Sequence, residues 1–208
     1  MLTLQDARAW YPEHDDVHGF GHIERVYRLC QKIGQAEGAD MEILLTAALL
    51  HDAQGSHPGE NSRDDHHLRS ADFAGEVLSG MGWPTEKIAL VQHCIRAHRY
   101  RKEDIPESLE AKLLFDADKL DVIGAVGVVR ALAYAFQAGT PAYTRPSGQF
   151  LEQGKTQAGE PHSAYHEYLF KLKNISARLI TPAARAIAAE RQVFLNRFFD
   201  QLAQEMQE

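Results

Sequence analysis

The sequence has few cysteines and no long apolar run, and each shortage excludes a class of protein. Its two cysteines, Cys30 and Cys94, form no CxxC pair, so we expect buried thiols and no thiolate zinc site. No apolar run approaches the roughly 18 residues of a membrane-spanning helix, and the sequence shows no signal peptide or lipidation motif. We therefore expect a cytoplasmic protein with no membrane partner.

Positive charge is also scarce. Lysine and arginine total 22 against 29 aspartates and glutamates, which gives a formal net charge of -7. Binding to a nucleic-acid polymer relies on clustered lysine and arginine, so we expect no such partner. The HExxH, GxSxG, GxxxxGK[ST] and GxGxxG motifs are absent, which argues against the metalloprotease, serine-hydrolase, P-loop and dinucleotide-binding classes. Histidine, with eleven copies, is the one compositional oddity.

Strand-like alternation is missing as well, whereas helical spacing of apolar residues recurs along the chain. The fold class expected is therefore all-α. Polar residues after Asp52 predict a loop, and the glycines and prolines between residues 139 and 163 predict a long irregular one. The predicted helices span 3–11, 23–38, 40–52, 69–81, 84–98, 110–137, 164–179 and 182–205.

The stretch LLTAALLHD, residues 44–52, indicates a buried central helix, because its first seven residues carry no charge. It ends in His51 and Asp52, which are costly to bury unless a partner satisfies them. A divalent cation is one such partner. In the alternative interpretation the helix surfaces at its end, with His51 near the C-terminal dipole and Asp52 in solvent.

Flanking motifs favour the cation. HGFGHIERV (18–26) places His22 at the start of a helix, and DADKLD (116–121) is an acidic cluster. The order His22, His51-Asp52, Asp118 resembles the H…HD…D pattern of the HD-domain superfamily of metal-dependent phosphohydrolases. HHLRSA (66–71) and the closing YHEYLFKLKNI resemble small members of that superfamily, so the likeness covers nearly the whole chain.

The resemblance implies a single HD-domain helical bundle over 1–208, with a metal-site core at about 18–135 and a helical C-terminal extension at about 164–205. It also implies that His22, His51, Asp52 and Asp118 bind a divalent metal. Two imidazoles and two carboxylates suit manganese best, with iron, nickel, zinc or magnesium as alternatives.

Helical spacing agrees with the choice of Asp118 within the acidic cluster. Asp118 and Asp121 share a face, whereas Asp116 points roughly 200° away from Asp118. We expect Asp116 at the surface or in a local pair, and Lys119 in solvent or a salt bridge. Asp121 is expected to orient a ligand or to pair with Arg25.

A proton donor for the leaving group is expected from His66 or His67, which the HHLRSA resemblance favours over His18 and His57. Asp52 would act in catalysis through the metal. The residues expected to bind substrate phosphates are Arg25, Arg96, His98 and Arg99.

Two of these assignments have alternatives. Arg25 could clamp an acidic side chain, and the positive run 96–102 could be a solvated helix end. Some HD enzymes hold a second metal near His93 and His98, but their spacing places these side chains about 140° apart, which is poor for one ion.

The expected function is hydrolysis of a phosphate ester or phosphoanhydride in a small metabolite, with a nucleotide as the expected substrate. The alternative is a metal-containing module that binds and senses a nucleotide without turnover. A diiron oxygenase is a further, less favoured reading. We expect a monomer or a homodimer.

Overall fold

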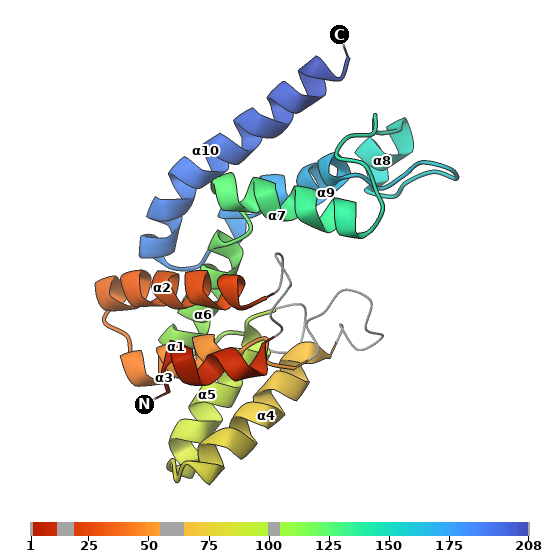
Figure 1. Ribbon diagram of the computed structural model, residues 1–208. Coiled ribbons are helices and arrows are strands. Elements are labelled where there is room, and N and C mark those ends of the chain that lie inside the picture. The colour runs from red at the N-terminus through yellow and green to blue at the C-terminus, as the bar shows by residue number, and fades with distance from the viewer. Residues whose placement is uncertain (1, 12–18, 55–64, 100–104, 208) are drawn as a thin grey trace. The chain divides into compact units, whose positions relative to one another are not determined.

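The computed structural model describes residues 2–11, 19–54, 65–99 and 105–207 (Figure 1). Every regular element in these ranges is a helix, and they contain no strand, which confirms the predicted all-α class. The chain divides into two compact units. Unit 1 comprises Met1–Lys119 with Ile180–Ala184, and unit 2 comprises Leu120–Leu179 with Arg185–Glu208.

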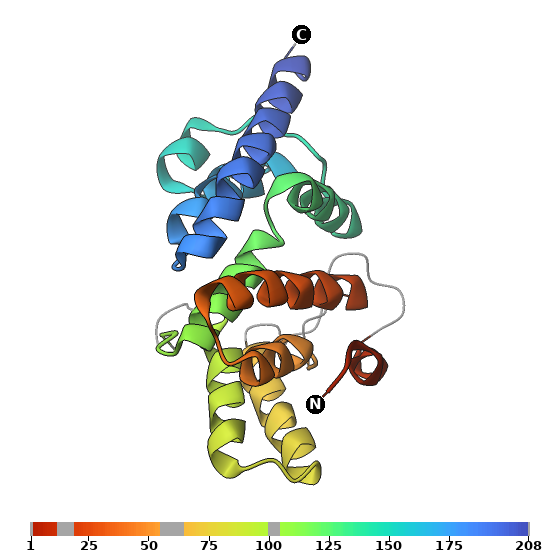
Figure 2. The same cartoon turned by 90° about the vertical axis from the view of Figure 1, so that its left-hand side faces the viewer.

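Unit 1 is built around α3 (Met41–Leu50), which packs against α1, α2, α4 and α5. Helices α4 and α5 also pack against each other, and both views show them side by side (Figure 2). The other elements of unit 1 are α1 (Leu4–Ala7), η1 (Arg8–Trp10), α2 (Phe20–Glu37), α4 (His66–Gly80), α5 (Thr85–Ala97) and most of α6 (Leu109–Leu120).

The central position of α3 confirms the prediction made from its apolar sequence. Eight of its ten residues, Ile43 to Leu50, are buried. Asp40 caps its first turn by accepting hydrogen bonds from the backbone nitrogens of Glu42 and Ile43. The preceding helix ends at Gly38, which has the left-handed φ of 76° that favours glycine at such ends.

Helix α4 begins at His66, three residues earlier than its apolar pattern predicts. The pattern underestimates the helix because its first turn, HHLR, is polar. A polar first turn has no apolar residues at helical spacing, so apolar spacing cannot locate the start of such a helix.

The predicted helix 110–137 is wrong in one respect, because it is two helices. α6 ends at Leu120 and α7 (Gly124–Gln137) begins after a break. Gly124 has φ of 75°, which other residues rarely adopt. A β-carbon there would also lie 3.0 Å from Cγ of Arg191. Both the backbone conformation and the close approach of Arg191 therefore favour glycine at this break.

Unit 2 contains α7, α8 (Gly148–Gln153), α9 (Ala164–Phe170) and most of α10 (Pro182–Glu205). Two predictions fail here. The stretch 139–163 is not wholly irregular, because it contains α8, whose first turn is capped by the hydroxyl of Ser147. The predicted helix 164–179 stops at Phe170 and continues as the single turns η2 (Leu172–Asn174) and η3 (Ser176–Arg178).

No single helix in the described residues is long and apolar enough to cross a membrane. Helices α6 and α7 reach that length and composition only when they are joined across their break.

Candidate metal centre

Helix α3 delivers the first pair of polar groups at its C-terminal end. His51 directly follows the helix and is fully buried, and Asp52 is 9% exposed. The Nδ1–H of His51 donates to the carbonyl of Ala48 at 2.8 Å. Since that bond places the proton on Nδ1, the Nε2 lone pair of a neutral His51 is directed into the site.

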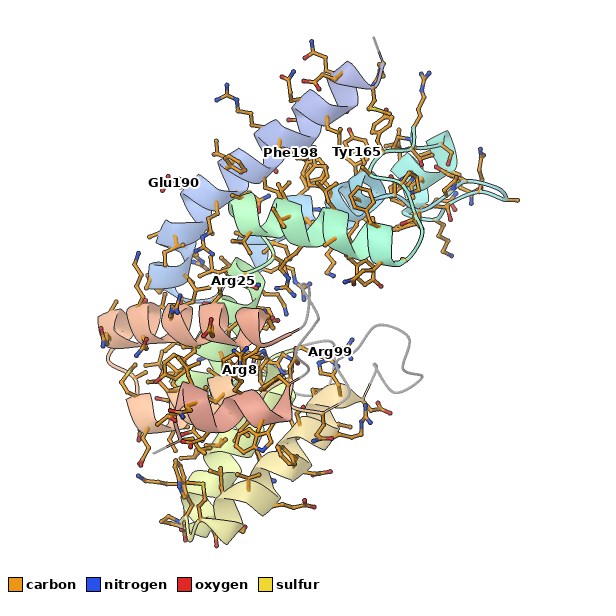
Figure 3. All side chains as sticks on the ribbon, viewed as in Figure 1. Arg8, Arg25, Arg99, Tyr165, Glu190 and Phe198 are labelled. Atoms are coloured by element: carbon orange, nitrogen blue, oxygen red, sulfur yellow. The ribbon has the colours of Figure 1, made fainter. Side chains whose placement is uncertain are left out.

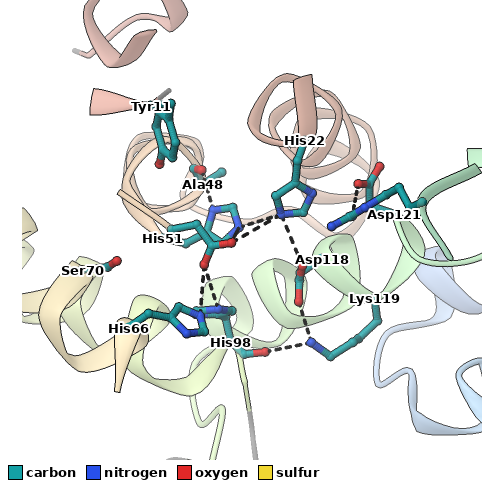
Figure 4. A network of polar contacts seen from close by, with 12 residues as sticks. Tyr11, His22, Ala48, His51, His66, Ser70, His98, Asp118, Lys119 and Asp121 are labelled. Carbon is teal, nitrogen blue, oxygen red and sulfur yellow. Dashed lines mark hydrogen bonds and ion pairs between the residues drawn. The ribbon is translucent and has the colours of Figure 1, made fainter. Parts of the chain in front are cut away.

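The second imidazole comes from the first turn of α2. His22 is 2% exposed, and its Nε2 lies 3.3 Å from Nε2 of His51. Oδ1 of Asp118, near the end of α6, lies 3.6 Å from the same His22 nitrogen. These three residues therefore present two ring nitrogens and one carboxylate toward a common point (Figure 4).

A second group lies beside the first. His66 opens α4 and His98 directly follows α5. Their Nε2 atoms lie 3.2 Å and 3.5 Å from Oδ1 of Asp52. The Nδ1–H of His98 donates to the carbonyl of Ile95 at 2.6 Å, so this ring also directs its Nε2 lone pair inward.

Asp52 lies between the two groups. Its Oδ1 faces His66 and His98, whereas its Oδ2 lies 3.8 Å from Nε2 of His22 and 3.9 Å from Nε2 of His51. One carboxylate thus offers one oxygen to each group.

The electrostatics of the site keep its carboxylates ionised. Burial alone would raise the pKa of Asp52, but the neighbouring His51 ring and the hydrogen bond from His66 hold it well below its usual range.

Asp118 follows the same rule. Burial alone would raise its pKa, but the Lys119 ammonium and the neighbouring imidazoles, His22 first, lower it well below the usual range. Burial lowers the pKa of His98 to about 4, so this imidazole is neutral near pH 7. Ionised carboxylates and neutral imidazoles are the protonation states that metal binding requires.

Tyr11 supports the end of α3 from outside the two groups. Its hydroxyl donates to the carbonyl of Leu49 at 2.7 Å. Burial, together with the nearby charge of Asp52, raises the pKa of Tyr11 well above its usual value, so the hydroxyl keeps its proton as a donor. No sequence pattern pointed to this residue, because a tyrosine near the start of a chain has no characteristic spacing to His51.

The donor set fits divalent cations. Within each group the possible ligand atoms all lie within 4.8 Å of one another. The Nε2 atoms of His22 and His51 lie 3.3 Å apart, so either a proton on one of them or a cation must lie between them. Nitrogen and carboxylate oxygen ligands together suit manganese, iron, nickel or zinc. The two groups are His22, His51 and Asp118, and Asp52, His66 and His98.

The structure separates several pairs of candidates. His66 joins a group, whereas the adjacent His67 does not. His98 groups with His66 on another helix and not with His93, whose Nε2 accepts a hydrogen bond from the backbone nitrogen of Glu107 at 3.2 Å. The spacing argument against His93 and His98 sharing one ion agrees with this arrangement.

The expectation for Asp116 is wrong. Asp116 is fully buried, and its carboxylate accepts hydrogen bonds from the backbone of Ile180 and from Thr181. The helical register correctly placed Asp116 and Asp118 on different faces of α6. The face that carries Asp116 is buried, however, and not at the surface. Asp121 pairs with Arg130.

The arginines expected to bind phosphate stay predictions. Arg96 is in the last turn of α5. Arg25 lies on α2 three residues after His22, and Arg99 follows α5 (Figure 3). Four other candidates lie outside the described residues: His18, His57, Arg101 and Lys102.

Comparisons with known proteins show the family of the chain. The family model described as HD domain matches residues 19–123. The uncharacterized protein YpgQ of Bacillus subtilis (strain 168) is 32% identical over 216 residues, which cover 99% of this chain and 95% of YpgQ. The crystal structure of YpgQ in complex with ADP matches with a TM-score of 0.72 and 30% identity, covering 98% of this chain and 97% of that one.

Two further solved structures have related descriptions. A predicted HD superfamily hydrolase from an uncultured Thermotogales bacterium matches with a TM-score of 0.65 and 28% identity over 98% of this chain and 90% of its own. An HD-superfamily hydrolase from Bacillus thuringiensis matches with a TM-score of 0.64 and 25% identity over 90% of this chain and 86% of its own.

Proposed function

The chain belongs to the HD domain family, and from that membership we propose that it is a divalent-metal-dependent phosphohydrolase acting on a nucleotide. The observation that carries the proposal is the pair of histidine and aspartate groups that share Asp52. Two of its structural neighbours are described as HD-superfamily hydrolases, which supports the reaction class.

In this proposal His22, His51 and Asp118 would hold one ion, and His66 with His98 would hold a second. Asp52 has one oxygen facing each group and would serve both. The roles of His66 and His98 thus change from proton donor and substrate contact to metal ligands. Divalent ions held there would lower the pKa of a water molecule and polarise a phosphoryl oxygen. Manganese is the proposed metal, because mixed nitrogen and carboxylate ligands suit it.

The chain's own residues would prepare this site. The bonds from His51 to Ala48 and from His98 to Ile95 fix each ring with its Nε2 lone pair inward, so little reorganisation is needed when a cation binds. Hydrolysis also needs a proton for the leaving oxygen. His67 is the proposed donor, because it lies beside His66, with ring centroids 5.8 Å apart, and belongs to neither ligand group found among the described residues.

A nucleotide is proposed as the substrate because YpgQ, which matches nearly the whole chain, was crystallised in complex with ADP. The alternative, a module that senses a nucleotide without turnover, draws on the same observation. The intact ligand groups favour the enzyme.

The test is product analysis. Metal-stripped protein is reloaded with manganese and incubated with nucleoside mono-, di- and triphosphates and cyclic nucleotides. Manganese-dependent release of phosphate, pyrophosphate or a linear nucleotide would support the enzyme and identify the bond that is cleaved. Stoichiometric metal and measurable ADP binding without turnover of any nucleotide would support the sensor.

A further inference from the structure

Lys119 lies at the candidate metal centre, where it forms the salt bridge that was one of the two roles expected from the sequence. It is the next residue after Asp118 on α6, and its side chain is only 14% exposed. Its ammonium lies 5.1 Å from the centre of the Phe115 ring, so an aromatic face covers part of it. Burying an ammonium costs free energy unless acceptors replace its water molecules.

The three N–H donors of this ammonium are only partly used. One donates to Oδ2 of Asp118 at 2.5 Å, and a second to the carbonyl of His98 at 3.4 Å. Within the described part of the chain no third acceptor lies in reach. Among the described residues the ammonium therefore keeps one donor. Its two contacts, to a residue of each ligand group, are drawn in Figure 4.

Asp118 divides its two oxygens between different partners. Oδ1 lies 3.6 Å from His22 Nε2, and Oδ2 accepts from Lys119. An ammonium bonded to a carboxylate weakens the attraction of that carboxylate for a cation, because like charges then lie close together. A site that only bound metal would gain from a neutral residue at position 119. The positive charge becomes favourable when an anion also occupies the site.

We propose that Lys119 binds a phosphate oxygen of the nucleotide through its remaining N–H, an inference that rests on the proposed function. Lysine binds phosphate as a compact positive charge, and the contacts to Asp118 and His98 hold that charge in place before the substrate arrives. The group recognised is the phosphate chain, so pyrophosphate and a nucleoside diphosphate share the contact.

The experiment measures binding by titration calorimetry in three steps: manganese to metal-stripped protein, then ADP and separately pyrophosphate to the manganese-loaded protein. The variant is Lys119→Met, which keeps the apolar stem over Phe115 and removes the charge. Lys112→Met is the matched control, since Lys112 is a half-buried lysine on the same helix with no part in the ligand groups.

We expect Lys119→Met to bind manganese at least as tightly as the wild type and to bind ADP and pyrophosphate about tenfold or more weakly. Lys112→Met should match the wild type throughout. Lys119→Arg should recover part of the pyrophosphate affinity. Unchanged affinity for ADP and pyrophosphate in Lys119→Met would overturn the proposal.

Two other results would also overturn it. Weaker manganese binding in Lys119→Met would mean that the lysine positions Asp118 and does not serve the anion. A loss for ADP without a loss for pyrophosphate would place its contact on the nucleoside. A wild type that binds manganese but neither anion would contradict the proposed function itself, and the inference would fall with it.

Discussion

Thr181 donates two hydrogen bonds to the carboxylate of Asp116, from its backbone nitrogen and from its hydroxyl, each at 2.7 Å to Oδ2. The backbone nitrogen of Ile180 adds a third, at 2.9 Å to Oδ1. Asp116 thereby joins α6 to the start of α10, which is the helix end where a negative charge is favourable. Asp116 lies only two residues from Asp118, yet it joins two helices, whereas Asp118 belongs to the candidate metal centre.

The same substitution is therefore expected to have different effects at the two positions. Asp116→Asn should lower the free energy of unfolding by about 2–3 kcal/mol, because an amide cannot accept all three bonds and its NH₂ faces donors. Urea denaturation measures the change. Asp118→Asn should leave stability nearly unchanged and remove metal binding. Equal loss of stability in both variants would show that the two carboxylates do not have separate roles.

His98 tests the second ligand group. His98→Ala should reduce bound manganese from two ions to one per chain, and His93→Ala should keep two, because His93 belongs to neither group. Metal analysis after gel filtration gives the stoichiometry. The affinity for that ion should fall by more than the roughly 10- to 100-fold that is typical when a hydrogen-bond partner of a metal ligand is lost. Two ions in His98→Ala would exclude the second group.

Tyr11 tests how the end of α3 is held. Tyr11→Phe removes the donor to the Leu49 carbonyl and leaves that carbonyl buried, which should cost about 1–3 kcal/mol of stability. Because Leu49 lies two residues before His51, manganese affinity should also fall. Thermal unfolding with and without manganese separates the two effects. A variant that loses neither stability nor metal affinity would show that this bond does not position the site.

Glu160 gives a prediction for acid stability in unit 2. Its carboxylate accepts hydrogen bonds from His166, from Gln157 and from the backbone and hydroxyl of Ser147. Burial opposes ionisation, but these bonds lower its pKa to about 2.

The sign of the pH dependence follows. A lowered folded-state pKa stabilises the protein above the unfolded value of 4.5, and that stabilisation is lost as the pH falls toward 2. Wild type should therefore melt at a higher temperature than Glu160→Gln at pH 6, with the difference shrinking between pH 4.5 and 2. Melting curves across that range measure it, and a constant difference would contradict the assignment.

The sequence predicted what depends on local pattern. The apolar run 44–50 predicted the central helix, and the order of His22, His51, Asp52 and Asp118 indicated a metal site whose residues the fold brings together. Apolar spacing did not reveal the break at Gly124, because the residues on both sides continue a helical period. A glycine that adopts a positive φ within such a run is identified only in three dimensions.

The sequence also could not predict the roles of residues whose partners lie far away along the chain. The burial of Asp116 depends on Thr181, which lies 65 residues away. Grouping His66 with His98 depends on the packing of α4 against α5, and the charge of Lys119 is informative only once its acceptors are known. Spacing along one helix could reject a pair such as His93 and His98, but it could not supply the correct partner.

The most direct test of the central claim measures nucleotide hydrolysis against manganese bound per chain, with Asp118→Ala in parallel. The account predicts that turnover rises with occupancy, ends when a chelator removes the metal, and is lost together with manganese in Asp118→Ala. Full turnover by the chelated wild type, or Asp118→Ala with both metal and turnover intact, would contradict it.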